Sequence, residues 1–268
     1  MDEVRRLSSL AWPVILGQLG LVGMGTVDLL MIGPLGRDAT AAVGLGNTWS
    51  FAVVIVALGA ATGIDPPVTQ AYGSGNPRRA GVAAARGMVL AALLCVPVML
   101  LHVAAEPALR LLGQPEAIIP EAATYTWIVA LSMPPMIAFG VLRQLLQGGG
   151  VMRPAMWVVL VGNLVNVAGN AWLIGPYGVA GVAWSTVIVR WFMFAALAVI
   201  GIPQIRAAWP DEPVLRLRAI GALAGIALPV GLQVGLEVWA FNAAGFVAGW
   251  FGAGAMAAHV AALNAIAR

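Results

Sequence analysis

Long apolar runs alternate with short polar breaks along the whole chain. Each run is long enough to cross a hydrocarbon core of about 30 Å as an α-helix. Seven complete runs lie at roughly 8–33, 46–70, 83–104, 123–146, 155–177, 179–202 and 220–250. An eighth begins near residue 253 and continues to Arg268. The pattern predicts an all-α, polytopic helical membrane protein.

The composition supports this prediction. Hydrophobic residues make up 61% of the chain and charged residues only 9%, whereas a soluble domain carries about 25% charged residues. All basic residues are arginine, and together with abundant Ala and Gly this usage is typical of a bacterium of high GC content. We therefore expect a multi-pass protein of the cell inner (plasma) membrane.

The arginines are distributed unevenly between the two predicted sides of the membrane. Only Arg37 and Arg110 lie on one side, and Arg190 and Arg268 belong to neither group. The other ten lie together if the N-terminus is inside: Arg5, Arg6, Arg78, Arg79, Arg86, Arg143, Arg153, Arg206, Arg216 and Arg218. This bias predicts a cytoplasmic N-terminus. Because the charge follows topology, the basic pI does not indicate binding to nucleic acid.

The chain also contains a partial internal repeat. "LAWPVILGQ" (10–18) is echoed by "IALPVGLQV" (226–234) after a polar segment that contains "PQIRAAWPDEPVLRLR". Six spans precede the second copy, so both copies enter the membrane in the same direction, as in parallel-repeat transporters. We predict a six-helix lobe at 1–202, a cytoplasmic linker at 203–219, and at 220–268 the first helix and part of the second helix of a truncated second lobe.

Several polar side chains lie inside the apolar runs. Asp28 interrupts a run from Leu10 to Leu35 that has no other charge. At 1.5 Å per residue, Asp28 lies about 9 Å, and Asn170 and Thr186 about 6 Å, outward of the midplane. Asn166 shares a helical face with Asn170. Carboxylate, amide and hydroxyl oxygens suit a proton or a hard cation such as Na⁺, so these four residues form a candidate cation site.

Each of these residues also has a structural interpretation. Intramembrane asparagines often only join helices, at about 0.6 kcal/mol per hydrogen bond. Asp28 costs roughly 3 kcal/mol at insertion, and a fixed ion pair with Arg190 would offset that cost but prevent proton exchange. Glu237 is a second intramembrane acid, either structural or able to exchange a proton for a cation, since burial disfavours the charged form.

No enzyme signature is present. Two histidines without HExxH spacing and one cysteine provide no metal site or activated nucleophile. Leu21 and Met24 share the helical face of Asp28 and are candidates for the wall of a substrate cavity, where adaptable side chains suit varied ligands. We expect a secondary active transporter rather than an enzyme, with no cofactor and no bound metal other than a coupling Na⁺.

Four stretches resemble the multidrug and toxic-compound extrusion (MATE) family and cover most of the chain in the family's order: "LAWPVILGQ…TVDLLMIGPLG", "TGIDPPVTQAYGSGNPRRA", "LLQGGGVMRPAMWVVLVGNLVNVAGNAWLI" and "LPVGLQVGLEVWAF…GAMAAHVAALNA". The resemblance implies a twelve-helix, two-lobe exporter that exchanges H⁺ or Na⁺ for small cationic, amphipathic drugs or metabolites. The full-length protein is expected to be a monomer in the bilayer.

The resemblance also implies roles for individual residues. Asp28 is similar to the family's coupling acid of helix 1, and Pro13 to the proline where that helix is proposed to bend. Asn166 and Asn170 match the paired asparagines of helix 5, Thr186 the hydroxyl of helix 6, and Glu237 the acid of helix 7. Two other functions remain open: a flippase for a lipid-linked oligosaccharide from the same superfamily, and an inactive truncated fragment.

Overall fold

The computed structural model describes residues 2–250, with side chains for 11–240 and 243. All regular elements in that part of the chain are helices. They are α1 (Asp2–Ile32), η1 (Gly33–Leu35), α2 (Arg37–Thr62), α3 (Asp65–Gly73), α4 (Pro77–Val103), α5 (Ala105–Leu111), α6 (Ile119–Ala130), α7 (Met133–Gly148), α8 (Arg153–Ile200), α9 (Ile202–Ala207) and α10 (Leu217–Trp250).

The predicted membrane spans are present in the described residues. Six helical stretches are long and apolar enough to cross a membrane, and the pair α6–α7 makes a seventh. The all-helical, multi-pass architecture is therefore confirmed. The second span begins at Arg37 rather than near residue 46, directly after a turn at Gly36 with φ of 108°. The eighth predicted run lies outside the described residues.

The fourth span is broken, and this break was not predicted. The axes of α6 and α7 differ by 49°, and Leu131 and Ser132 lie between the two helices. Pro134 and Pro135 follow directly at the start of α7. Proline has no backbone N–H to continue a helix and also disfavours helical geometry in the residue before it. The break is therefore a local consequence of the sequence.

The fifth and sixth spans are two halves of α8. They meet at Gly178, whose φ of 55° and ψ of −128° are not helical. The halves cover Arg153–Tyr177 and Val179–Ile200, so the predicted division near residue 178 is confirmed. The second half packs back on the first: Ser185 Oγ donates a 3.1 Å hydrogen bond to the carbonyl oxygen of Asn166. A Cβ at Gly169 would lie only 2.5 Å from Ser185 Oγ, so glycine permits this approach.

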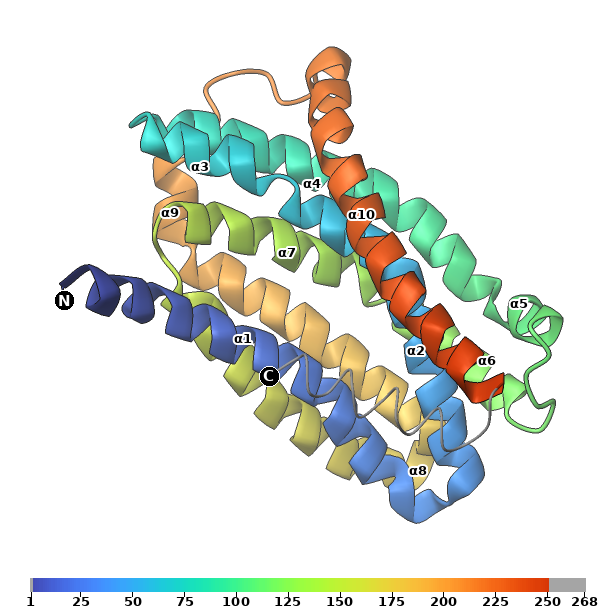
Figure 1. Cartoon of the computed structure of the whole chain (residues 1–268). Helices are drawn as coiled ribbons and strands as arrows, with labels where there is room; N and C mark the ends of the chain where they lie inside the picture. The colour runs from blue at the N-terminus through green and yellow to red at the C-terminus, as the bar shows by residue number, and fades with distance from the viewer. Residues whose placement is uncertain (1, 251–268) are drawn as a thin grey trace.

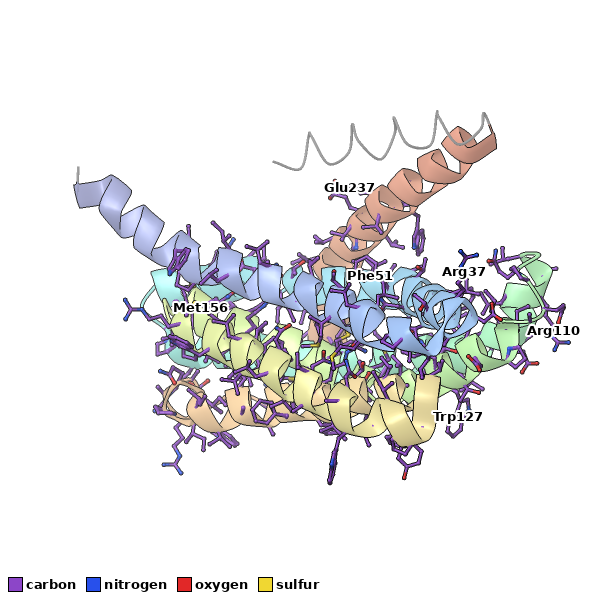
Figure 2. The ribbon with its side chains drawn as sticks, turned by 90° about the horizontal axis from the view of Figure 1, so that it is seen from below. Arg37, Phe51, Arg110, Trp127, Met156 and Glu237 are labelled. Atoms are coloured by element: carbon purple, nitrogen blue, oxygen red, sulfur yellow. The ribbon has the colours of Figure 1, made fainter. Side chains whose placement is uncertain are left out.

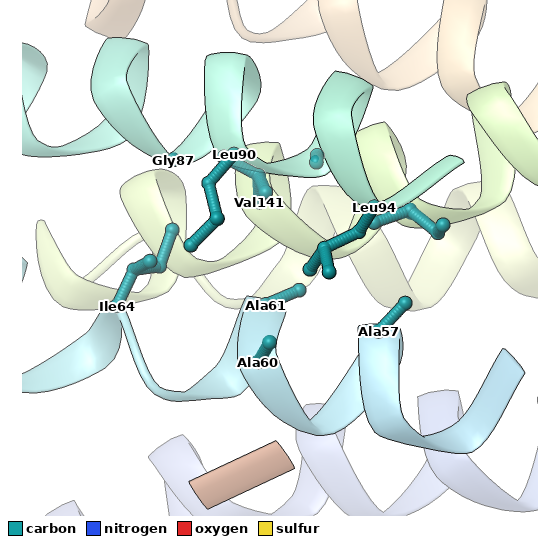
Figure 3. Close-up of a pocket in the computed structure, with 10 residues that line it drawn as sticks. Ala57, Ala60, Ala61, Ile64, Gly87, Leu90, Leu94 and Val141 are labelled. Atoms are coloured by element: carbon teal, nitrogen blue, oxygen red, sulfur yellow. The ribbon is translucent and has the colours of Figure 1, made fainter. Parts of the chain in front are cut away.

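Small residues bring the inner helices close together. Figure 3 shows where α2, α4 and α7 meet, with Ala57, Ala60 and Ala61 on one side and Gly87 on another. The remaining gap leaves no volume that a water molecule could occupy. Cys95 is buried in the same part of the core.

Helix α10 packs along α2 (Figure 1). The contact depends on glycine, because a Cβ at Gly59 would lie 2.8 Å from Gly231 Cα and one at Gly63 would lie 2.7 Å from Ala227 Cα. Close backbone approach at small residues is typical of helix pairs in membranes. The short helix α9 occupies the start of the predicted linker, and an irregular segment follows it until α10 begins at Leu217. The assignment of 1–202 and 220–268 to separate lobes stays a prediction.

Candidate cation site

Helix α1 lies along α8, and a tight joint fixes their register (Figures 1 and 2). Asn163 Nδ2 donates to the carbonyl oxygen of Gly20 at 3.0 Å and to that of Val159 at 2.9 Å. A Cβ at Gly20 would lie 2.6 Å from Val159 Cγ1, so the lack of a side chain at Gly20 lets Val159 pack against the backbone of α1. The joint places the next two turns of α1 against the polar face of α8.

Asp28 lies on that part of α1 and accepts three hydrogen bonds from α8. Its Oδ1 accepts from Asn166 Nδ2 at 3.0 Å and from Asn170 Nδ2 at 2.7 Å. Its Oδ2 accepts a longer bond, 3.4 Å, from Thr186 Oγ1. The asparagines are one turn apart on the first half of α8, and Thr186 comes from the half beyond Gly178. Asp28, Asn170 and Thr186, which sequence spacing placed at similar depth, therefore meet, together with Asn166 from the same face of α8. We call these four side chains the Asp28 cluster.

The Asp28 cluster is closed to its surroundings. Asp28 is 4% exposed, Thr186 3%, and both asparagines 0%. Burying a carboxylate is costly unless it is paired or hydrogen-bonded. Here neutral amide and hydroxyl groups, not a cation, supply the donors.

Arg190 does not form a salt bridge with Asp28. Among the described side chains, no basic nitrogen lies within 4.0 Å of an Asp28 oxygen. Arg190 Nη1 instead donates a 2.7 Å hydrogen bond to Ser132 Oγ, at the break between α6 and α7. Its charge still acts on Asp28 electrostatically. The fixed ion pair that the sequence left open is thus not observed.

The cluster also has an unused oxygen. Asn170 Oδ1 is buried and has no hydrogen-bond partner among the described residues. Together with the Asp28 carboxylate and the Thr186 hydroxyl, it gives an all-oxygen set of the kind that protons and hard cations prefer. The described residues contain no group of three or more His, Cys, Asp or Glu side chains that could hold a metal ion. The chemistry of the cluster therefore suits H⁺ or Na⁺ rather than a transition metal.

Comparison with known proteins shows which family the chain belongs to. A family model described as MatE matches residues 13–172. The chain is 30% identical over 267 residues to a probable multidrug resistance protein NorM of Synechocystis sp., covering 96% of this chain and 58% of the relative. The chain belongs to the MATE family. It is also 33% identical over 268 residues to the multidrug resistance protein NorM of Burkholderia vietnamiensis, covering 95% of this chain and 57% of that relative.

The fold of this MATE-family chain agrees with solved structures. The crystal structure of the eukaryotic MATE transporter AtDTX14 superposes with a TM-score of 0.85 at 18% sequence identity, covering 92% of this chain and 56% of that one. At that identity the likeness concerns the fold. The chain spans somewhat more than half the length of the relatives it matches.

Tyr125 is a neighbour of the cluster that sequence reasoning missed. This α6 side chain is 1% exposed, interacts with the Thr186 hydroxyl, and experiences the charges of both Asp28 and Arg190. Gly46 leaves room for its ring, because a Cβ there would lie 2.6 Å from Tyr125 Cδ1. A lone tyrosine in an apolar run was the available signal. Its partners come from distant segments, so spacing along the chain could not reveal them.

The remaining candidate residues of this MATE-family chain make no hydrogen bond within the cluster. Glu237 is exposed on α10 (Figure 2) and has no hydrogen bond or ion pair with the four residues. Pro13 is buried within the continuous helix α1. Met24 is 8% exposed and packs in the core with Leu21 beside it, so both fill the space between helices. Their coupling, hinge and substrate roles stay predictions.

Proposed function

We propose that the complete protein is a cation-coupled antiporter that exports small cationic, amphipathic compounds by alternating access. The Asp28 cluster is the proposed H⁺ or Na⁺ site. The observation that carries the proposal is a buried carboxylate that has three neutral hydrogen-bond donors and no salt bridge to any described side chain. Such a carboxylate keeps an exchangeable charge, whereas a fixed guanidinium partner would neutralise it permanently.

The hydrogen bonds give the coupling its physical basis. An ionised Asp28 is stabilised by the amides of Asn166 and Asn170 and by the Thr186 hydroxyl. When H⁺ or Na⁺ neutralises Asp28, the bonds that hold α1 to both halves of α8 weaken, because hydrogen bonds to a charged acceptor are about twice as strong as neutral ones. Helix α1 can then shift near Pro13, and the lobes rock around the site. In the opposite state, the ionised acid attracts the next cationic substrate.

Relatives support the class of function. Two relatives match nearly the whole chain, and one is named multidrug resistance protein NorM and the other probable multidrug resistance protein NorM. A third, from Pseudomonas aeruginosa, is named multidrug resistance protein PmpM. We extend that function to this chain as part of the proposal. The structure of this chain supports the proposal through the geometry of the Asp28 cluster.

The test is uptake of ethidium into everted vesicles that contain the complete protein, driven by an outward-directed proton or Na⁺ gradient. We expect Asp28→Asn to lower the initial rate at least about tenfold, equivalent to roughly 1.4 kcal/mol of lost coupling. The matched control is Asp38→Asn, because Asp38 is an exposed acid in the first turn of α2. Undiminished uptake by vesicles with Asp28→Asn, at equal protein level, would exclude Asp28 as the coupling residue.

A further inference from the structure

A cavity of about 420 Å³ lies away from the Asp28 cluster, in the range of volumes typical of ligand sites. Its walls are the first turns of α4, the last turns of α7, α9, and the segment 208–214. Apolar side chains make up most of the lining, among them Ala84, Ala85, Met88, Leu142, Leu145 and Ile205. Glu212 contributes an acid and Trp209 an indole ring.

Ion pairs hold the outer wall of this cavity in place. Arg86 Nη2 donates to the carbonyl oxygen of Pro213 at 3.5 Å and lies 3.6 Å from a Glu212 oxygen. Arg78 lies 3.8 Å from an Asp211 oxygen. The backbone of Ala208 packs directly on Gly81, where any side chain would clash. The cavity is therefore built between fixed elements of the fold.

The position of the cavity along α4 matches the boundary between lipid headgroups and acyl chains. Helix α4 begins at Pro77, so at 1.5 Å per residue the lining residues 81–88 lie about 6–17 Å from its end. The arginines at 78 and 79 lie at the end itself. Trp209, which is 67% exposed, is the kind of side chain found at membrane interfaces. The site thus has an apolar interior and a polar rim.

The rim is strongly basic. Seven arginines lie within four residues of lining positions along the sequence, against the two acids Asp211 and Glu212: Arg78, Arg79, Arg86, Arg143, Arg206, Arg216 and Arg218. Arg216 also lies 3.9 Å from the Glu212 oxygen, so that carboxylate is shared between two guanidinium groups. Arg79 and Arg206 have no ion pair among the described side chains. The excess positive charge favours an anionic headgroup and repels a cationic compound.

We propose that this cavity binds an anionic phospholipid, with an acyl chain against α4 and α7 and the phosphate at the arginine rim. Basic pockets between membrane helices bind anionic headgroups in this way. The proposal adds a lipid site to the transport function and does not depend on it, since its lining comes from α4, α7, α9 and segment 208–214 rather than from α1 and α8.

The test uses the purified complete protein in detergent and counts bound lipid by native mass spectrometry. Phosphatidylglycerol or phosphatidylcholine is added in separate samples. We expect the protein to retain one bound phosphatidylglycerol molecule, and far less phosphatidylcholine. Ala85→Trp fills the cavity and should remove most of that adduct. Ala92→Trp is the matched control, because Ala92 is exposed on the same helix. Equal retention by both tryptophan variants would overturn the proposal.

A second pair of variants tests the rim without filling the cavity. Each arginine near an anionic surface contributes about 1 kcal/mol, or roughly fivefold in affinity, so Arg79→Gln with Arg206→Gln should weaken phosphatidylglycerol binding roughly 25-fold. Phosphatidylcholine binding should not change. An unchanged preference for phosphatidylglycerol in a protein with unaltered thermal unfolding would overturn the placement of the headgroup. No substrate or ion gradient is present, so the result is independent of transport.

Discussion

Two regions of the molecule hold charged side chains in opposite environments, one buried and one exposed. In the Asp28 cluster, one carboxylate is almost fully buried and accepts hydrogen bonds only from neutral groups at 2.7–3.4 Å. At the outer wall of the lipid cavity, several charges form ion pairs at 3.6–3.9 Å with half-exposed acids. In the buried Asp28 cluster, no water is at hand to replace a lost hydrogen bond. At the exposed cavity wall, water can take the place of a missing ion-pair partner. Losing one partner of a charged group is therefore expected to cost much more free energy of unfolding in the Asp28 cluster than at the cavity wall.

The largest effect after loss of Asp28 itself is expected from Asn170→Leu. This change removes the shortest hydrogen bond to a buried charge, which typically contributes about 2 kcal/mol. We expect a matching fall in the free energy of unfolding, with efflux strongly reduced. Combining it with Asp28→Asn should recover most of the stability, because the uncompensated charge is gone. Denaturant unfolding of wild type, the two single variants and the double variant measures these free energies. If the losses of the two single variants simply add in the double variant, Asn170 and Asp28 do not interact.

A smaller effect is expected at the joint between α1 and α8. Gly20→Ala places a Cβ 2.6 Å from Val159 Cγ1. Overpacking of this kind costs about 1–3 kcal/mol, and the higher helix propensity of Ala offsets up to about 1 kcal/mol of that cost. Gly23→Ala is the matched control, since nothing lies within 4 Å of a Cβ there, and it should be neutral or stabilise by up to about 1 kcal/mol. Thermal unfolding compares the two, and equal midpoints would contradict the tight joint.

The smallest effect is expected in the exposed region. Arg78→Gln removes the contact of Arg78 with Asp211, both of which are exposed, and exposed pairs are worth about 0–1 kcal/mol. The stability difference between wild type and variant should shrink as salt rises, since screening weakens surface pairs. Unfolding at low and high NaCl tests this. A loss as large as that of Asn170→Leu would remove the contrast between the two regions.

The sequence allowed much of this architecture to be predicted. Apolar runs located the spans, because a membrane imposes length and hydropathy on each helix separately. Helical periodicity and depth also placed Asp28, Asn170 and Thr186 together. These inferences needed only the rise and turn of a helix and the thickness of the bilayer.

Other features depended on side-chain direction and could not be derived in this way. Whether Arg190 reaches Asp28 or Ser132 depends on the rotamer of a long side chain. Tyr125 meets Thr186 because two distant helices pack side by side, and Arg86 meets Glu212 because the segment after α9 folds back on α4. The break before Pro134 was readable from the two prolines, but a continuous apolar run concealed it.

The joint at Gly20 has a mechanical consequence for α1. It lies seven residues after Pro13 and eight before Asp28, so the helix has two arms of about 10 and 12 Å on either side of a fulcrum. A rigid rod with nearly equal arms moves its two ends by similar amounts in opposite directions. Displacing the Asp28 end by an ångström would therefore move the Pro13 end by about the same amount in the opposite direction.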